Sequence, residues 1–287
     1  SASAKVVQIY EKLITDDKVD LIFAPWGTAH HFALTALLER LKVPMMGNTA
    51  ASVKIRELKA NYIWFPASGM PDQLAKSLVD LMKAQKIKTA AVLTLQLPYS
   101  LEVHQHLLPA MKEAGIAVVV DKDYPPTIKD MTAQLTVTKA ANPDAVLSLS
   151  YPSDSVLYME QARTLGVNAP FQLVLIGPSI PFFGKVLGPA TDGIVTLGQW
   201  SPHQKNWPRA KPFLDAYKAK FNDVPDYLDT ALVYMSCEIV EQAVATAGLD
   251  REAFRSAYAG GAFDTIGGKI SFNGVEVTAP TLISQVQ

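Results

Sequence analysis

The chain has 287 residues, of which 49% are hydrophobic and 18% charged, which is enough apolar material for more than one domain core. Lys and Arg number 26 and Asp and Glu 27, so the net charge of -1 offers no basic surface that would attract nucleic acid. The longest apolar runs are strand-sized, far below the roughly 20 residues of a membrane-spanning helix. We therefore expect a soluble protein of two domains without a nucleic-acid partner.

Short apolar runs alternate with helical patterns over most of the chain. Amphipathic patterns occur at 4–15 and after Pro71, where a proline suits the first turn of a helix. Strands that are apolar along their whole length and separated by helices indicate parallel sheets covered on both faces. The sequence therefore predicts an α/β fold with strands at 19–24, 43–46, 88–95, 116–120, 144–150, 172–177 and 193–198.

The pattern changes to consecutive helices from about Pro202 to Ala259. A β-hairpin is expected after them, with Asn273 and Gly274 in a type I′ turn. Cys237 lies within one of the helical runs, where we expect a small buried hydrophobe. No Gly/Ser-rich linker divides the chain, which indicates that it crosses between the two domains more than once.

Ligands of open parallel sheets bind beyond the carboxyl ends of the strands, so the residues after each apolar run are candidate site residues. Six such loops carry hydroxyls and aromatic rings and one charged residue, Asp154. This composition is typical of a binding cleft rather than of a reaction centre. The hydroxyls are Thr28, Thr49, Ser52, Ser100, Ser153, Ser155 and Ser179, and the aromatic residues are Trp26, Tyr99, Tyr151, Phe182, Phe183 and Trp200.

Motifs of catalysis and of nucleotide binding are missing from these loops. They contain no carboxylate pair, no G-x-S-x-G elbow and no phosphate-binding glycine loop. His30 and His31 are the remaining candidates, but adjacent residues at a helix start point in different directions, and no H-E-x-x-H or Cys partner accompanies them. We expect no enzyme, no metal and no cofactor, with at most one of the two imidazoles facing a cleft.

The stretch 21–34, LIFAPWGTAHHFAL, leads from a strand into a helix. Backbone N–H groups and the positive end of the helix dipole at such a junction suit a carboxylate. Thr28 is expected to be both the helix N-cap and a ligand donor. The same arrangement recurs at 47–52, GNTAAS. The alternative, that these hydroxyls are helix caps without a ligand, stays open for each loop.

The order of elements resembles the type I periplasmic solute-binding proteins of ABC transporters, in the leucine/isoleucine/valine-binding branch. The likeness covers most of the chain and is carried by YEKLITDDKVDLIFAP, LKVPMMGNTAAS, VDLMKAQKIKTAAVL, YPSDSVLYMEQARTLGV and GPATDGIVTLG. It implies two α/β lobes joined by three crossovers, a ligand trapped between them by hinge closure, and no catalysis. It also implies a periplasmic monomer, exported by a signal peptide outside this sequence, that hands its ligand to an ABC permease in the membrane.

The resemblance also implies the lobe boundaries. Crossovers are expected near 68–71, 200–203 and 260–263, giving a first lobe of 1–69 plus 202–260 and a second of 70–201 plus 261–287. Members of the family begin with a strand, a helix and a strand before the segment that matches 4–15. The first lobe of this sequence is expected to lack those elements.

The resemblance assigns ligand contacts position by position. The carboxylate-holding loops of the family and its two cleft tyrosines fall on Gly27, Thr28, Ala29 and His30, on Asn48, Thr49 and Ala50, and on Tyr99 and Tyr151. Amino-acid binders of this branch hold the ligand ammonium with a glutamate in a Gly-Pro-Glu turn, whereas residues 177–179 are Gly-Pro-Ser. A buried ammonium would go unpaired there, at a cost of several kcal/mol.

We therefore predict a carboxylate without an amine, an aromatic acid of the benzoate, hydroxybenzoate or phenylpropenoate type. Its ring is expected among Trp26, Tyr99, Tyr151, Phe182 and Trp200, with a ring hydroxyl meeting Ser179. Phe182 or Phe183 is the aromatic residue most expected to serve packing alone. Three alternatives stay open: a branched-chain amino acid or amide ligand, a cytoplasmic ligand-sensing regulator of the same fold, and an enzyme centred on His30 or Ser179.

Overall fold

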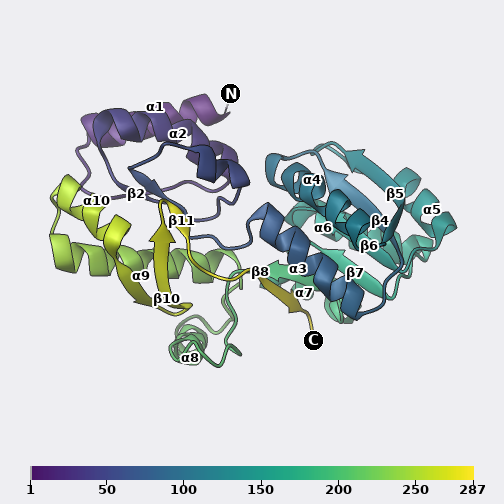
Figure 1. The fold of residues 1–287 in the computed structure, drawn as a ribbon. Helices are drawn as coiled ribbons and strands as arrows, with labels where there is room; N and C mark the ends of the chain where they lie inside the picture. Colours follow the sequence, from purple (N-terminus) through teal and green to yellow (C-terminus); the bar gives the residue numbers. More distant parts are fainter. Residues whose placement is uncertain (1) are drawn as a thin grey trace. The chain divides into compact units, whose positions relative to one another are not determined.

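The computed structural model describes residues 2–287, which form two compact units (Figure 1). Unit 1 comprises Ser1–Ser68 and Gln199–Pro280, and unit 2 comprises Gly69–Gly198 and Thr281–Gln287. The first two boundaries thus lie within a few residues of the predicted ones, whereas the third lies at 280/281 instead of 260/261. No helix in residues 2–287 combines the length and the apolar character that crossing a bilayer demands.

Unit 1 contains a parallel sheet of order β1-β2-β3 and an antiparallel sheet of order β11-β10-β9. An isolated bridge between Phe65 and Glu276 connects the two sheets. Figure 1 shows helix α1 beside α2, and α9 and α10 beside the antiparallel strands. The elements are α1 (Ala2–Thr15), β1 (Ile22–Phe23), α2 (Thr28–Leu41), β2 (Met45–Met46), β3 (Ile63–Trp64), α8 (Ala210–Phe221), α9 (Asp229–Ala247), α10 (Arg251–Gly260), β9 (Ala262–Thr265), β10 (Gly268–Asn273) and β11 (Glu276–Val277).

Unit 2 is built on a six-stranded sheet of order β12-β8-β7-β6-β4-β5, in which β12 alone runs antiparallel to its neighbour. Helix α3 packs on α4 and helix α5 on α6. Prolines stand in the first turn of α3, α4, α6 and α7, as their fixed φ favours. The elements are α3 (Pro71–Ala84), β4 (Thr89–Leu95), α4 (Pro98–Glu113), β5 (Ala117–Tyr124), α5 (Thr132–Ala141), β6 (Ala145–Leu149), α6 (Pro152–Leu165), β7 (Phe171–Val174), α7 (Pro181–Leu187), β8 (Val195–Gly198) and β12 (Leu282–Gln285).

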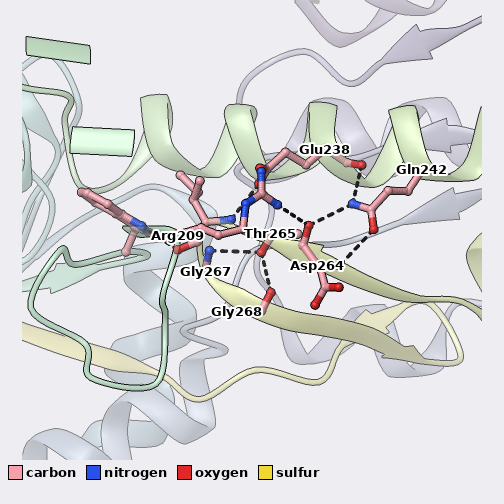
Figure 2. Close-up of polar contacts among 9 residues, drawn as sticks. Arg209, Glu238, Gln242, Asp264, Thr265, Gly267 and Gly268 are labelled. Atoms are coloured by element: carbon pink, nitrogen blue, oxygen red, sulfur yellow. Dashed lines mark hydrogen bonds and ion pairs between the residues drawn. The ribbon is translucent and has the colours of Figure 1, made fainter. Parts of the chain in front are cut away.

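A polar network explains why the third boundary prediction is wrong (Figure 2). Arg209 donates from Nη1 to the Asp264 carbonyl at 2.8 Å and from Nη2 to Glu238 on α9. The other carboxylate oxygen of Glu238 accepts from the backbone N–H of Ile266 at 2.7 Å. Gln242, one turn further along α9, donates to the Asp264 carbonyl at 2.9 Å and accepts from the Asp264 N–H at 3.0 Å. These bonds fasten β9 and the turn after it to α9, so the hairpin belongs to unit 1.

Two local predictions also need correction. Cys237 is exposed on α9 rather than buried, because the buried face of that helix is formed by neighbours such as Met235, Ile239 and Val240. In the predicted hairpin, Asn273 pairs with Glu276, so Gly274 and Val275 are the central residues of the turn rather than Asn273 and Gly274. Gly274 adopts φ +61°, a conformation that glycine accepts without steric cost.

Candidate functional site

Two loops of unit 1 follow neighbouring parallel strands and so begin at the same edge of the sheet. Strands β1 and β2 pair in register, with Ile22 opposite Met45 and Phe23 opposite Met46. We call residues 24–30, after β1, the first loop, and residues 47–52, after β2, the second loop. The backbone pairing continues one step past the strands, since Ala24 N–H donates to the Met46 carbonyl at 2.9 Å.

Side chains of the second loop hold the first loop in place. The Thr49 hydroxyl accepts from the Gly27 N–H at 3.0 Å and donates to Asn48 Oδ1 at 3.0 Å. The side-chain nitrogen Nδ2 of Asn48 donates to the Ala24 carbonyl at 2.8 Å. Asn48 and Thr49, which the sequence predicts to touch ligand, therefore also fix the shape of the two loops.

His31 makes the third connection between the loops. Its Nδ1 lies 2.9 Å from the Gly27 carbonyl, and its Nε2 lies 3.2 Å from the Asn48 backbone nitrogen. A carbonyl accepts a proton and an amide donates one, so the ring is neutral with hydrogen on Nδ1. Burial agrees with this state, because it lowers the pKa of His31 to about 4. Of the two predicted imidazoles His31 is thus a buried brace, while His30 is partly exposed with Nδ1 3.3 Å from Ser3 Oγ.

The start of α2 leaves donors for a ligand. Gly27, with φ +96°, is the residue before the helix and provides no side-chain cap, so the prediction that Thr28 is the N-cap is wrong: Thr28 is the first helical residue. Among the hydrogen bonds of residues 2–287, none involves the backbone N–H of Thr28 or of Ala29. Two amides at the positive end of a 14-residue helix are thus available to an anion.

The second loop offers less than the sequence predicts. Ala50 has no exposed surface, so its side chain is a core residue and is not available to a ligand. Gly47 approaches its neighbours closely, since a Cβ there would lie 2.5 Å from the Trp64 carbonyl oxygen. A side chain at this position would push the second loop away from His31, whose Cδ2 would lie 3.3 Å from the same Cβ.

An aspartate outside the predicted site residues lies beside the first loop. The indole Nε1 of Trp26 is 3.3 Å from both carboxylate oxygens of Asp229, the first residue of α9. Trp26 is 46% exposed and Asp229 is half-buried. The two residues lie 203 positions apart in the sequence. The PDYLD segment by itself indicates only the start of a helix with acidic residues, so nothing in it predicts the contact.

In unit 2 the hydroxyls of Tyr99 and Ser179 are hydrogen-bonded to backbone carbonyls of the same unit. Tyr99 is buried in the first turn of α4, and its hydroxyl donates to the Gly69 carbonyl at 2.7 Å. The buried Ser179 hydroxyl donates to the Leu197 carbonyl and lies 3.2 Å from Thr196 Oγ1. Tyr151 is half-buried just before α6, and burial together with Asp154 raises the pKa of its phenol to about 12.

The structure changes the interpretation of three further residues. Trp200 has no exposed surface and donates from Nε1 to the Ile266 carbonyl at 3.0 Å, so it is a core residue of unit 1 rather than a ligand contact. Asp154 is buried in unit 2, where it accepts from the Tyr124 hydroxyl at 2.6 Å and from the Tyr151 N–H at 3.2 Å. Phe183 is buried packing, as expected for one of the pair, while Phe182 is 60% exposed.

Within residues 2–287, one group of side chains has the geometry to hold a metal ion. His104 on α4 and Asp121 and Asp123 on β5 place ligand atoms within 4.8 Å of one another, and His104 Nε2 lies 2.8 Å from Asp121 Oδ1. Both aspartates are exposed, and none of the three is a predicted ligand residue. His31 is no metal ligand in this arrangement, because both of its ring nitrogens are hydrogen-bonded.

Comparisons with known proteins agree with this architecture. A Leu/Ile/Val-binding protein homologue of Brucella suis is 27% identical over 265 residues, which cover 86% of this chain and 65% of that protein. The chain therefore spans less than two thirds of the length of that relative. The leucine-binding protein LivK of Thermotoga maritima superposes with a TM-score of 0.87 at 25% identity, covering 99% of this chain and 81% of the other.

A solute-binding protein of an ABC transporter from Rhodopseudomonas palustris, solved in complex with 3,4-dihydroxybenzoic acid, superposes with a TM-score of 0.84. It is 22% identical, and the match covers 99% of this chain and 79% of that one, so it shows the shared fold. The family description "periplasmic binding protein" matches residues 1–286. The chain therefore belongs to the periplasmic binding protein family and has the two-lobed type I fold of its leucine/isoleucine/valine-binding relatives.

Proposed function

We propose that this protein is the extracytoplasmic solute-binding component of an ABC importer, which captures a small carboxylate and delivers it to a membrane permease. Membership in the periplasmic binding protein family supports this role, and so do the transporter proteins that share the fold. Binding rather than catalysis accounts for the site, because its polar groups are mostly backbone donors and hydroxyls with no proton acceptor arranged beside a nucleophile.

The observation that carries the proposal is the pair of backbone donors at the start of α2. Thr28 and Ala29 lie in a first turn whose preceding residue, Gly27, is held by Thr49 and His31. A donor pair fixed before the ligand arrives loses little conformational entropy on binding, which favours a small anion such as a carboxylate. By hinge closure, as the family resemblance implies, a ligand with higher affinity for the closed form would raise the population of that form.

Within this function we propose an aromatic acid as the ligand. The 177–179 turn ends in Ser179, and Asp154, the charged residue of the predicted unit 2 loops, is buried and bonded to Tyr124. Neither offers a counter-charge to an α-ammonium in unit 2. The partly exposed rings of Trp26 and Tyr151 suit a flat apolar body. The Rhodopseudomonas palustris protein that shares the fold was solved with such an acid.

A branched-chain amino acid is the second candidate, and one observation favours it. Asp229 places a carboxylate beside the first loop, where the ammonium of a ligand whose carboxylate sits on Thr28 and Ala29 would find a counter-charge. The leucine-binding protein that shares the fold is in keeping with this class of ligand.

The test is a thermal-shift panel on the complete mature protein with benzoate, hydroxybenzoates, acetate, leucine and valine. A ligand that binds only the folded state raises the melting temperature by mass action. We expect aromatic acids to give the shift. Stabilisation by leucine or valine alone would replace the aromatic acid with an amino acid, and no shift with any of these ligands between pH 5 and pH 8 would overturn the function.

A matched pair of variants tests the backbone donors. Thr28→Pro removes one N–H while keeping a residue suited to the first helical position, whereas Thr28→Ala removes only the hydroxyl. We expect Thr28→Pro to abolish the ligand-induced shift and Thr28→Ala to retain most of it. Equal effects of the two changes would mean that the hydroxyl rather than the backbone holds the ligand. The melting temperature without ligand shows whether Thr28→Pro still folds as the parent does.

A further inference from the structure

Two aspartates stand at the start of α9, and they are in different situations. Asp226 accepts hydrogen bonds from the backbone N–H groups of Leu228 at 3.1 Å and Thr230 at 2.9 Å, and from that of Asp229. Its carboxylate therefore occupies the amides that a helix N-terminus normally offers to an anion. Asp229 cannot use those amides.

The negative charge of Asp229 therefore has no cationic partner among residues 2–287 and few hydrogen-bond donors. Its hydrogen bonds come from the Trp26 indole, and in residues 2–287 it takes part in no ion pair. Two groups act on its titration: Asp226, from the segment before α9, disfavours the charged form, and Trp26, from the first loop, favours it. Burial raises the pKa of Asp229 most, Asp226 raises it further and Trp26 lowers it. The net result is a pKa raised to about 6.

The position of α9 brings this charge to the ligand loops. Trp26, the hydrogen-bond donor to Asp229, directly precedes Gly27 and the free amides of Thr28 and Ala29. Further along the same helix, Ser236 Oγ lies 3.4 Å from the Gly47 carbonyl of the second loop. Helix α9 thus contacts both loops, and its first residue, Asp229, accepts from the indole of Trp26, two residues before Thr28.

We propose that Asp229 is a selectivity residue of the carboxylate site, which disfavours a plain carboxylate on the first loop while it is ionised and admits one when it is protonated. This inference rests on the proposed function. Two like charges close together cannot both persist without a cost, so binding of a simple acid takes up a proton at Asp229. A ligand with an ammonium beside its carboxylate binds better when Asp229 is ionised, because the ammonium and the Asp229 carboxylate attract each other.

Isothermal titration of benzoate between pH 5 and pH 8 tests the proposal, using the parent, Asp229→Asn, and Asp20→Asn as an exposed control in unit 1. For the parent and the control we expect affinity to rise by up to about tenfold for each pH unit lowered above pH 6, and to level off below it. Asp229→Asn should bind benzoate equally at all pH values and more tightly than the parent at pH 8. A flat profile in the parent, or the same slope in Asp229→Asn, would overturn the proposal.

The pH dependence of benzoate affinity in Trp26→Phe distinguishes an electrostatic role of Asp229 from a purely structural one. Loss of the indole N–H removes the bond that favours ionised Asp229, so the pH at which benzoate affinity levels off should move upward. An unchanged profile would contradict a direct role for the pair.

Failure of the aromatic-acid assignment gives a separate result. If leucine binds and benzoate does not at any pH, the ligand proposal is wrong, and Asp229→Asn then decides the role of this residue. Loss of leucine binding in Asp229→Asn would uphold Asp229 as the selectivity residue. Leucine binding equal to that of the parent would overturn it.

Discussion

His31 and Asn48 connect the two loops of unit 1: the backbone nitrogen of Asn48 lies 3.2 Å from Nε2 of a ring whose Nδ1 is 2.9 Å from the Gly27 carbonyl. One buried imidazole therefore joins Gly27, the residue before α2, to Asn48, the second residue of the second loop. The donor positions of a ligand site depend on such supports, because an error of an ångström weakens every bond to the ligand.

Replacing His31 with alanine should loosen both loops. We expect the free energy of unfolding to fall by about 2 to 4 kcal/mol, since two buried hydrogen bonds and the packing of the ring on Phe65 are lost. Ligand affinity should fall as well. Urea unfolding measures the stability, with His30→Ala as the control, because its partly exposed ring makes one long contact to Ser3. Equal losses in the two variants would contradict the bracing role.

The low pKa of His31 gives stability a defined pH dependence. Above pH 6.5 the ring is neutral in both the folded and the unfolded chain; below it the unfolded chain gains a proton that the folded one refuses until about pH 4. Stability should therefore decrease as pH falls from 6.5 to about 4, by roughly 3 kcal/mol at most. Urea unfolding of the parent and of His31→Gln at several pH values measures this contribution as the difference between their free energies of unfolding. If the two free energies change in parallel with pH, the prediction is wrong.

Glu238 should be needed to hold the hairpin of β9 and β10. Burial raises the pKa of its carboxyl, while Arg209 and the Ile266 N–H favour the charged form. Glu238→Ala removes both contacts and leaves the Ile266 N–H without its acceptor, so we expect a loss of about 2 to 3 kcal/mol in unfolding free energy. Glu241→Ala, at an exposed position on the same helix, should change stability by less than about 0.5 kcal/mol. A small effect at Glu238 would show that apolar packing alone holds the hairpin.

Gly268 in β10 and Gly274 in the turn that follows β10 form a matched pair. Gly268 has φ +84°, and a Cβ there would lie 2.7 Å from Trp207 Cδ1, whereas Gly274 has φ +61° and open space around it. Gly268→Ala should lower the free energy of unfolding by about 2 to 3 kcal/mol, through backbone strain and the clash with Trp207. Gly274→Ala should lower it by about 1 kcal/mol, through backbone strain alone. Equal effects, measured by chemical unfolding, would mean that Trp207 moves aside without cost.

Local patterns predict much of the architecture because they depend on neighbours along the chain. Whole-length apolar runs locate β4, β6 and β8, and Pro71 marks the start of α3. The short strands β3 and β12 are missed, since they exist through pairing with β2 and with β8 rather than through a run of their own. Gly27, rather than Thr28, precedes α2 because a left-handed backbone turn is needed there, and only glycine takes it readily.

By itself the sequence determined the α/β alternation, the two loops after β1 and β2, and the absence of a catalytic motif, because strand and helix periodicity and short motifs act over a few residues. Only the tertiary structure decided which lobe holds the hairpin, that Trp200 is core, and that Asp229 stands beside Trp26. Those outcomes depend on contacts between residues far apart in the chain, which are selected by burial and hydrogen-bond pairing of the whole unit and leave no local pattern.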